Sequence, residues 1–265
     1  MKTFIKYLAI ITLLPGAALA DDYAGMSPEE KGLAIAQKAD ATTNGFVDST
    51  ANMRMILTNR HGQTSERELR VRTMEVENDG DKSMTIFDTP ADVKGTALLT
   101  YTHKLKNDDQ WLYMPAIRRV KRMSSSNKSG PFMGSEFAFE DLGSQEVEKY
   151  TWKYLKDEEL NGVATYVLER IPVDKKSGYT RQIIWMHQAN LYALKIDFYD
   201  RKNSLLKTLD FSDHKLYQDK FWRAHNMMMV NHQTGKKTDL IWSDIVFGNG
   251  YTTSDFTKQS LQRLR

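Results

Sequence analysis

The feature that most constrains the fold is a period-two alternation of apolar and polar residues, which begins after Gly45 and continues almost to the end of the chain. In residues 191–199 every second residue is apolar, while the intervening Lys195 and Asp197 are charged. Successive side chains of a strand point to opposite faces, so this pattern predicts strands with one apolar face. The strand candidates are 52–58, 69–72, 83–87, 96–101, 110–114, 148–155, 164–171, 180–186, 191–199, 204–210, 221–230 and 238–247.

Short connections link several of these segments. Residues 160–162, 176–178 and 200–203 contain the Gly, Asn and Asp residues that tight turns prefer. A meander of these strands, each with one apolar face, predicts a mainly β protein. We expect a single antiparallel sheet that curves around a helix or closes towards a barrel.

Two helices are expected outside the strands. Ser27 followed by Pro28 and by Glu30 forms a capping box with proline at the first helical position. The resulting helix should run over about residues 28–40, with Leu33, Ala36 and Ile35 on its buried side. Residues 256–264 have the pattern of a short C-terminal helix.

The N-terminus has the organisation of a cleavable secretory signal. Lys2 and Lys6 precede an apolar stretch over residues 7–14, and the small-x-small pattern of 18–20 leads to Asp21. Residues 1–20 are therefore interpreted as a cleavable signal peptide for secretion through a membrane. Residues 21–265 are expected to form one domain, because no linker or internal repeat divides them.

Composition restricts the classes of function. The chain has no cysteine, so it has neither disulfides nor a thiol nucleophile. Removing Lys2 and Lys6 with the signal lowers the formal net charge from +3 to +1, which does not favour nucleic-acid binding.

Catalytic and metal-binding motifs are weak. The six histidines form no HExxH pattern, and His225 and His232 would point to opposite faces of a single strand. Gly134-Ser135 lacks the glycine of a nucleophile elbow, and no phosphate loop or dinucleotide fingerprint occurs. We therefore expect no cofactor, no metal and no enzymatic activity.

Residues 111–142 have an unusual composition for a connection. An aromatic run stops at Pro115, and a polar Ser/Asn/Gly hinge follows over residues 124–130. The cations Arg118, Arg119, Lys121, Arg122 and Lys128 have no acid among them. The apolar residues after the hinge are Phe132, Met133, Phe137 and Phe139. This segment is interpreted either as a lid over an apolar ligand with an anionic end, or as a connection whose aromatics pack in the core.

The apolar face of the sheet has two alternative roles, which are a solid core or the wall of a ligand cavity. Several of the 13 methionines lie on strands, and methionine suits surfaces that accept variable apolar ligands. The residues expected to line a hydrophobic concavity are Met53, Met55, Leu57, Leu69, Val71, Met84, Ile86, Leu98, Trp111, Tyr113, Tyr166 and Leu168. Arg118, Arg119, Lys121 and Arg122 are expected to contact a head group or a partner, with a solvated flank as the alternative.

Several segments resemble the outer membrane lipoprotein-sorting family, whose members are similar to the periplasmic carrier LolA. They are residues 87–99, 109–115, 118–119, 132–135 and 140–142. The resemblance implies an incomplete, strongly curved β-barrel with an N-terminal helix and a helical lid over a hydrophobic concavity. It also implies a monomeric carrier of lipid or lipoprotein acyl chains that acts beside an inner-membrane RND/MMPL-type exporter. A lipid-sensing regulatory module and an envelope glycolipid enzyme are the alternatives.

Overall fold

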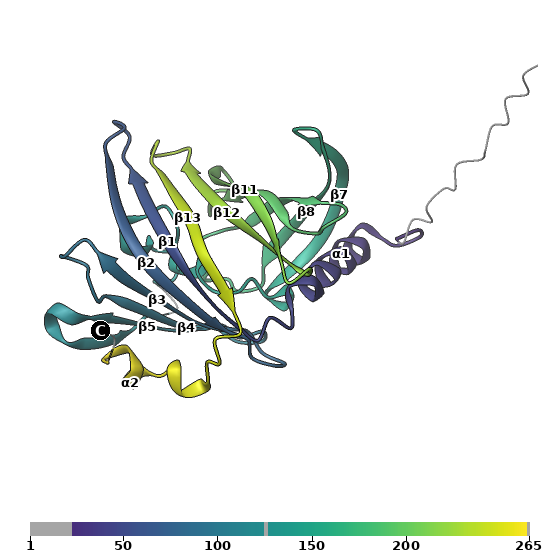
Figure 1. Ribbon diagram of the computed structural model, residues 1–265. Helices are drawn as coiled ribbons and strands as arrows, with labels where there is room; N and C mark the ends of the chain where they lie inside the picture. The colour runs from purple at the N-terminus through teal and green to yellow at the C-terminus, as the bar shows by residue number, and fades with distance from the viewer. Residues whose placement is uncertain (1–22, 125–126, 264–265) are drawn as a thin grey trace, which may run out of the picture.

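A curved antiparallel sheet dominates the protein (Figure 1). The computed structural model describes residues 23–124 and 127–263, and all thirteen strands found there belong to this sheet. The strands are β1 Asp48–Thr58, β2 Thr64–Met74, β3 Lys82–Thr89, β4 Ala97–Tyr101, β5 Asp109–Met114, β6 Arg119–Arg122, β7 Tyr150–Leu160, β8 Val163–Pro172, β9 Arg181–His187, β10 Ala193–Tyr199, β11 Leu205–Tyr217, β12 Phe221–Asn231 and β13 Lys237–Phe247.

The order of the strands leaves the sheet unclosed. It runs β6-β5-β4-β3-β2-β1-β13-β12-β11-β10-β9-β8-β7, so β6 and β7 are the two edges. The first and last strands pair near the centre, with Met53 opposite Trp242. The predicted mainly β fold with a strongly curved, incomplete barrel is confirmed. Strand β6 was not predicted, because its four residues lie within the basic cluster.

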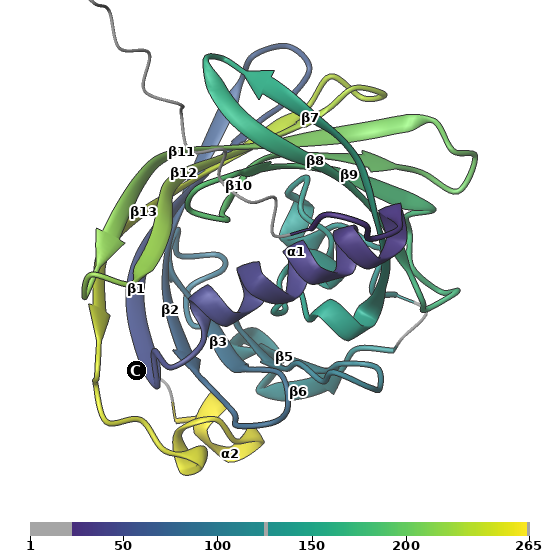
Figure 2. The same cartoon turned by 90° about the vertical axis from the view of Figure 1, so that its right-hand side faces the viewer.

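The two faces of the sheet pack against different partners. The concave face carries the larger hydrophobic cluster, which includes Met55, Leu168 and Met229 and residues of the N-terminal helix. The outer face of β3, β4 and β5 carries a second cluster, which is covered by Phe256 and Leu261 of the C-terminal segment. Figure 2 shows this segment outside the ring of strands, whereas the N-terminal helix crosses the opening.

The N-terminal helix α1, Pro28–Thr43, begins where the capping box predicts. The Ser27 amide donates to Glu30 Oε2 at 2.8 Å, and the Glu30 amide donates to Ser27 Oγ at 3.2 Å. Ile35 and Ala36 are buried as expected, but Leu33 is 40% exposed, so its predicted burial is wrong. The buried face instead includes Gly32, whose missing side chain lets α1 approach the backbone of β7.

The C-terminal segment ends in a short helix α2, Lys258–Leu261, within the predicted range 256–264. Asp48, which is 1% exposed, fixes the turn before it by accepting hydrogen bonds from the backbone amides of residues 249–251. The 3-10 turns are Pro115–Ile117, Phe132–Gly134, Phe139–Asp141, Val147–Lys149 and Thr253–Asp255.

The expected signal peptide, residues 1–20, lies outside the described residues. Among the residues that are described, no helix combines the length and apolar character needed to cross a membrane.

The close approach at Gly32 leads to a first prediction. A Cβ atom at this position would lie 2.6 Å from the Lys153 carbonyl carbon and from the Tyr154 amide nitrogen. We expect Gly32→Ala to lower the free energy of unfolding by about 1–3 kcal/mol, although alanine favours helices, because backbone atoms have to move. Urea titration measures the change. Gln37→Ala, on the exposed side of the same helix, is the control and should be neutral or stabilising. A Gly32→Ala variant as stable as the parent would show that the contact imposes no constraint.

Candidate binding cavity

The connection between β6 and β7 crosses the concave face of the sheet. Within it, residues 131–142, here called the plug, form two 3-10 turns linked by a bridge between Pro131 and Ala138. Phe132 is fully buried, and its ring lies 5.7 Å from Phe87 and 5.5 Å from Phe139, centroid to centroid. The plug therefore fills part of the concavity with aromatic side chains.

Buried polar groups attach the plug to β11, β12 and β13. Lys207 Nζ on β11 donates to Asp141 Oδ2 and to the Glu136 carbonyl, both at 2.8 Å. The Lys207 and Asp141 side chains are only 4% and 8% exposed, so the pair is screened little by water. Asn231 donates to the Glu136 carboxylate at 2.7 Å, and Thr238 accepts from the Glu136 amide at 3.0 Å.

The plug is attached to the opposite half of the sheet as well. Arg67 on β2 donates to the Met133 carbonyl at 2.5 Å, and Gln110 on β5 donates to the Phe139 carbonyl at 2.9 Å. These bonds join strands that are remote in the sheet order through one short segment. The plug thus bridges the two halves of the sheet across the concave face.

Carboxylates of the plug also bind the turn between β8 and β9. Tyr179 Oη donates to both Asp141 oxygens, at 2.9 and 3.0 Å, and Gly178 donates its amide to Glu140 at 2.8 Å. Burial and the neighbouring Asp141 raise the pKa of the Tyr179 phenol well above its usual value. Burial also raises the pKa of Glu140, although the Gly178 and Ser177 hydrogen bonds oppose this effect.

An open cavity remains between α1 and the sheet. This α1 cavity has a volume of about 620 Å³ and reaches apolar side chains of β9, β10 and β11, namely Ile184, Met186, Ile196 and Phe211. An aromatic pocket of about 340 Å³, lined by Trp222, Trp242 and Met227, lies next to it. Both are lined by Tyr192, Ala193 and Phe211, so the two spaces are neighbours. Their volumes are in the range of about 300–1,000 Å³ that small-molecule sites have.

Eight of the twelve residues expected to line the concavity lie on the concave face. They belong to the same hydrophobic cluster as the plug phenylalanines, and they are Met53, Met55, Leu57, Leu69, Val71, Leu98, Tyr166 and Leu168. Of these, Val71 lines the aromatic pocket. Most of the predicted wall is therefore core that packs around the plug, and the open volume lies farther along the sheet.

The other four expected lining residues lie on the outer face. Met84, Ile86, Trp111 and Tyr113 pack with Phe256 and Leu261. On β3 the residues that face inward are Thr85, which pairs with Val71 and Leu98, and Phe87, which belongs to the inner cluster. On β5 it is Leu112, which pairs with Leu98. The prediction was wrong for these four because β3 and β5 have apolar residues on both faces, so alternation alone did not identify the inner one.

The plug residues lie as expected for a connection whose aromatic side chains pack in the core, which is one of the two interpretations of residues 111–142. Phe132, Phe137 and Phe139 are buried, and Met133 is half-buried beside them.

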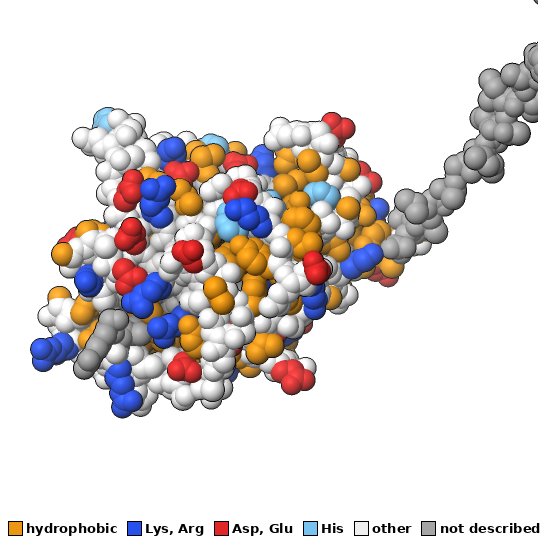
Figure 3. Space-filling model, viewed as in Figure 1, with side chains coloured by type: hydrophobic (Ala, Val, Ile, Leu, Met, Phe, Trp, Pro, Cys, Tyr) orange, Lys and Arg blue, Asp and Glu red, His pale blue; other side chains and the backbone are white. Residues whose placement is uncertain are grey.

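The four basic residues expected to contact a head group or a partner lie on and next to the edge strand β6. They are Arg118, Arg119, Lys121 and Arg122, and all four are exposed. Positive side chains project at the end of the molecule that the β5–β6 hairpin occupies (Figure 3). Arg122 pairs with Asp109, and none of the four lines the cavities described above.

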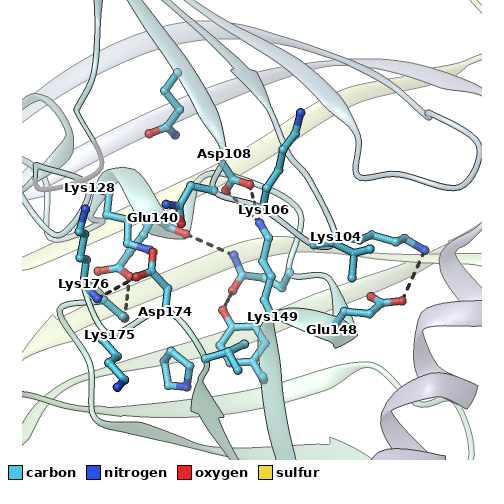
Figure 4. A pocket seen from close by; sticks show the side chains of 18 of the residues that line it. Lys104, Lys106, Asp108, Lys128, Glu140, Glu148, Lys149, Asp174, Lys175 and Lys176 are labelled. Atoms are coloured by element: carbon cyan, nitrogen blue, oxygen red, sulfur yellow. Dashed lines mark hydrogen bonds and ion pairs between the residues drawn. The ribbon is translucent and has the colours of Figure 1, made fainter.

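A different cationic site lies at the seam between the two sheet edges. This lysine basin has a volume of about 770 Å³ and is shown in Figure 4. Its lysines come from four separate segments, and they are Lys104, Lys106, Lys128, Lys149, Lys175 and Lys176. Two of them form close ion pairs, Lys128 with Asp174 at 2.6 Å and Lys149 with Asp108 at 2.7 Å. Most of the residues that line the basin are charged or polar, so it suits charged groups rather than acyl chains.

Two features of the α1 cavity were not predicted from the sequence. One is Arg170, which is 4% exposed and lines the cavity. It follows Tyr166 and Leu168 at period two, so the same alternation could have placed it on the inner face. The other is a carboxylate rim that includes Asp40, Asp79 and Asp81, for which the sequence offers no local signal.

Among the described residues, no cluster of potential ligands could hold a metal.

The structure is thus an open half-barrel whose concave face holds a plug. Known proteins with similar sequences and structures identify its family. A family model described as "Uncharacterized protein" matches residues 79–263. The structure of an outer membrane lipoprotein-sorting protein domain from Vibrio parahaemolyticus is 56% identical. It has a TM-score of 0.88, and the match covers 89% of this chain and 100% of that one. The chain therefore belongs to the outer membrane lipoprotein-sorting protein family.

Two further solved structures are similar to the chain. A DUF1329 family protein from Desulfovibrio piger is 30% identical with a TM-score of 0.85, over 89% of this chain and 100% of that one. A LolA superfamily protein from Nitrosomonas europaea shares the fold at 22% identity, with a TM-score of 0.70 over 86% of this chain and 98% of that one. A search of curated proteins gives no match.

Asp81 on the cavity rim leads to a prediction on pH. Burial, together with the negative charges of Glu146 and Glu75, raises its pKa from 3.8 to about 7. The folded state therefore keeps a proton that the unfolded state has lost, and stability falls as the pH rises from about 4 to about 7. We expect Asp81→Asn to be increasingly stabilising, relative to the parent, across this range. The gain should reach a few kcal/mol at most and level off above about pH 7.

The measurement is the urea midpoint of both proteins at several pH values. Asp157→Asn, at an exposed position on β7, is the control. A difference between Asp81→Asn and the parent that does not change with pH would contradict the argument.

Proposed function

We propose that the protein is a periplasmic carrier that binds acylated cargo, either lipid or lipoprotein, in the α1 cavity and the aromatic pocket. The observation that carries this proposal is an open cavity with one apolar wall, continuous with an aromatic pocket and beside a plugged core, in a member of the lipoprotein-sorting family. Burial of an acyl chain contributes about 0.8 kcal/mol per CH₂ group, so a space of this size can hold cargo without covalent attachment. A carrier of this kind needs no catalytic group.

The plug provides a means of release. Its phenylalanines occupy apolar space that a second acyl chain could also fill, so plug and cargo would compete for the concave face. A competing internal segment lowers the apparent affinity by the fraction of protein in the open state. Reversible binding is what transfer between two membranes requires.

The exposed cations suit contact with a membrane partner. We propose that Arg118, Arg119, Lys121 and Arg122, together with the lysine basin, face an anionic membrane surface or an RND/MMPL-type exporter of the inner membrane. Clustered charges speed such encounters, and salt weakens their effect. Cross-linking in native membranes would identify the partner, and mass spectrometry of co-purifying molecules would identify the cargo. A stable complex without cargo exchange would favour a sensing module instead.

Filling the cavity tests the proposed carrier. Ala193 lines both open spaces, so we expect Ala193→Phe to reduce transfer of a fluorescent lysophospholipid between donor and acceptor vesicles by roughly tenfold. The thermal midpoint should change little, because the added ring enters empty space. Ala189→Phe places the same ring on the exposed β9–β10 turn and should transfer normally. Equal transfer by both variants would reject the cavity as the cargo site.

Removing the buried cation of the plug tests the release mechanism. Lys207→Met leaves the Asp141 carboxylate without its ion pair, which typically costs about 3–5 kcal/mol. We expect the plug to loosen, so the variant should be less stable and should bind more of a neutral hydrophobic dye. Lys202→Met, on the exposed β10–β11 turn, is the control. Lower stability with unchanged dye binding in the folded protein would mean that the plug is ordinary core.

A further inference from the structure

Arg170 on β8 has an unusual environment for a buried guanidinium. Its Nε donates to Gln182 Oε1 at 2.7 Å, and one Nη donates to Gln145 Oε1 at 3.1 Å. Its guanidinium carbon lies 4.2 Å from the Tyr150 ring centroid and 5.7 Å from that of Trp152. No carboxylate of the described residues lies within ion-pair distance of it.

Such an arrangement is costly unless an anion completes it. A buried charge is normally paired, because amide oxygens and aromatic rings compensate only part of its lost hydration. Burial lowers the pKa of Arg170, and the opposing groups are Tyr150, Asp141 and Tyr179. Asp141 already pairs with Lys207, and the rim carboxylates of the α1 cavity are not among these groups. A planar guanidinium with a donor to spare is suited to a carboxylate or phosphate.

The lining of the α1 cavity changes character along its length. Arg170 and Gln182 face each other across β8 and β9, and Leu168 pairs with Ile184 one step further along the inner face. Beyond Ile184 the cavity is lined by Met186 and Ile196 and leads to the aromatic pocket. Arg170 is therefore next to an apolar stretch of the wall, which is the outline of an amphiphile with an anionic head. The remainder of the cavity is lined by Lys104 and by carboxylates, namely Asp40, Glu75, Glu77, Asp79, Asp81 and Glu146.

We propose that Arg170 is the head-group site of the cavity, and that the cargo class is a single-chain amphiphile with a carboxylate or phosphate end. The head contacts Arg170, and the chain runs past Ile184 and Met186 towards the aromatic pocket. This inference rests on the proposed carrier function and narrows it. It assigns to Arg170 a preference among ligands of equal chain length, whereas the apolar lining supplies affinity to all of them.

The test uses the intact protein and three ligands that differ only in the head group, namely dodecanoate, dodecanol and dodecylamine. Each displaces a neutral naphthylamine dye at neutral pH. We expect dodecanoate to bind roughly tenfold to a hundredfold more tightly than dodecanol, as a charge-assisted hydrogen bond implies, and dodecylamine to bind most weakly. Dodecyl phosphate in the same assay distinguishes a phosphate head from a carboxylate head.

Variants locate the effect. Arg170→Gln should bind dodecanoate and dodecanol equally, and Arg170→Lys should keep part of the preference. Arg181→Gln is the matched control. The guanidinium carbon of Arg181 lies 3.6 Å from the Tyr199 ring centroid, and the side chain is next to Glu169 rather than in the cavity. Its preference should equal that of the parent.

The possible results separate the two proposals. Dye binding with no preference for dodecanoate in the parent protein would overturn the role of Arg170 and leave the carrier intact. Failure of the dye and all ligands to bind would overturn both. If Arg170→Gln does not fold, the three ligands are compared on the parent protein at several pH values. The preference for dodecanoate over dodecanol should then disappear below about pH 4–5, where the ligand carboxyl is protonated.

Discussion

Pairing between the first and last strands is the constraint on which the remaining structure depends. β1 and β13 pair over most of their length at the centre of the sheet. The strands β2 to β6 lie progressively farther out on one side, and the strands β12 to β7 lie progressively farther out on the other. The chain thus reaches one edge at β6 and resumes at the other edge with β7. The connection between them has to span the concave face, and its aromatic residues are buried there as a result.

The plug combines two kinds of interaction that differ in their response to water. Its phenylalanines contribute non-directional burial, whereas Lys207, Asp141 and Glu136 form directional contacts in a site with little solvent. Directional contacts fix one arrangement and lose their strength once water enters. The release proposed above would therefore be a change between two states rather than a gradual movement.

The sequence predicted most of the fold but only part of the site, and particular residues show why. Alternation and turn residues located the strands of both halves and the capping box located α1, because these signals are local. Met84 and Trp111 were assigned to the wrong face because their strands are apolar on both sides, and the outer side packs on the distant C-terminal segment. Leu33 was misplaced because contact with β7 selected Gly32 instead. Arg170 was detectable by parity, but its lack of an ion pair is a property of the folded chain.

The open sheet has a consequence for association between copies of the chain. Unpaired edge strands expose backbone donors and acceptors to any other extended segment, which is a common route to aggregation. Here β6 has only four residues, three of which are exposed cations, and α1 lies against the backbone of β7. The basic edge therefore repels an identical edge, and the helix occupies space that an added strand would need. The protein can therefore leave its sheet unclosed without presenting a free template for fibre growth.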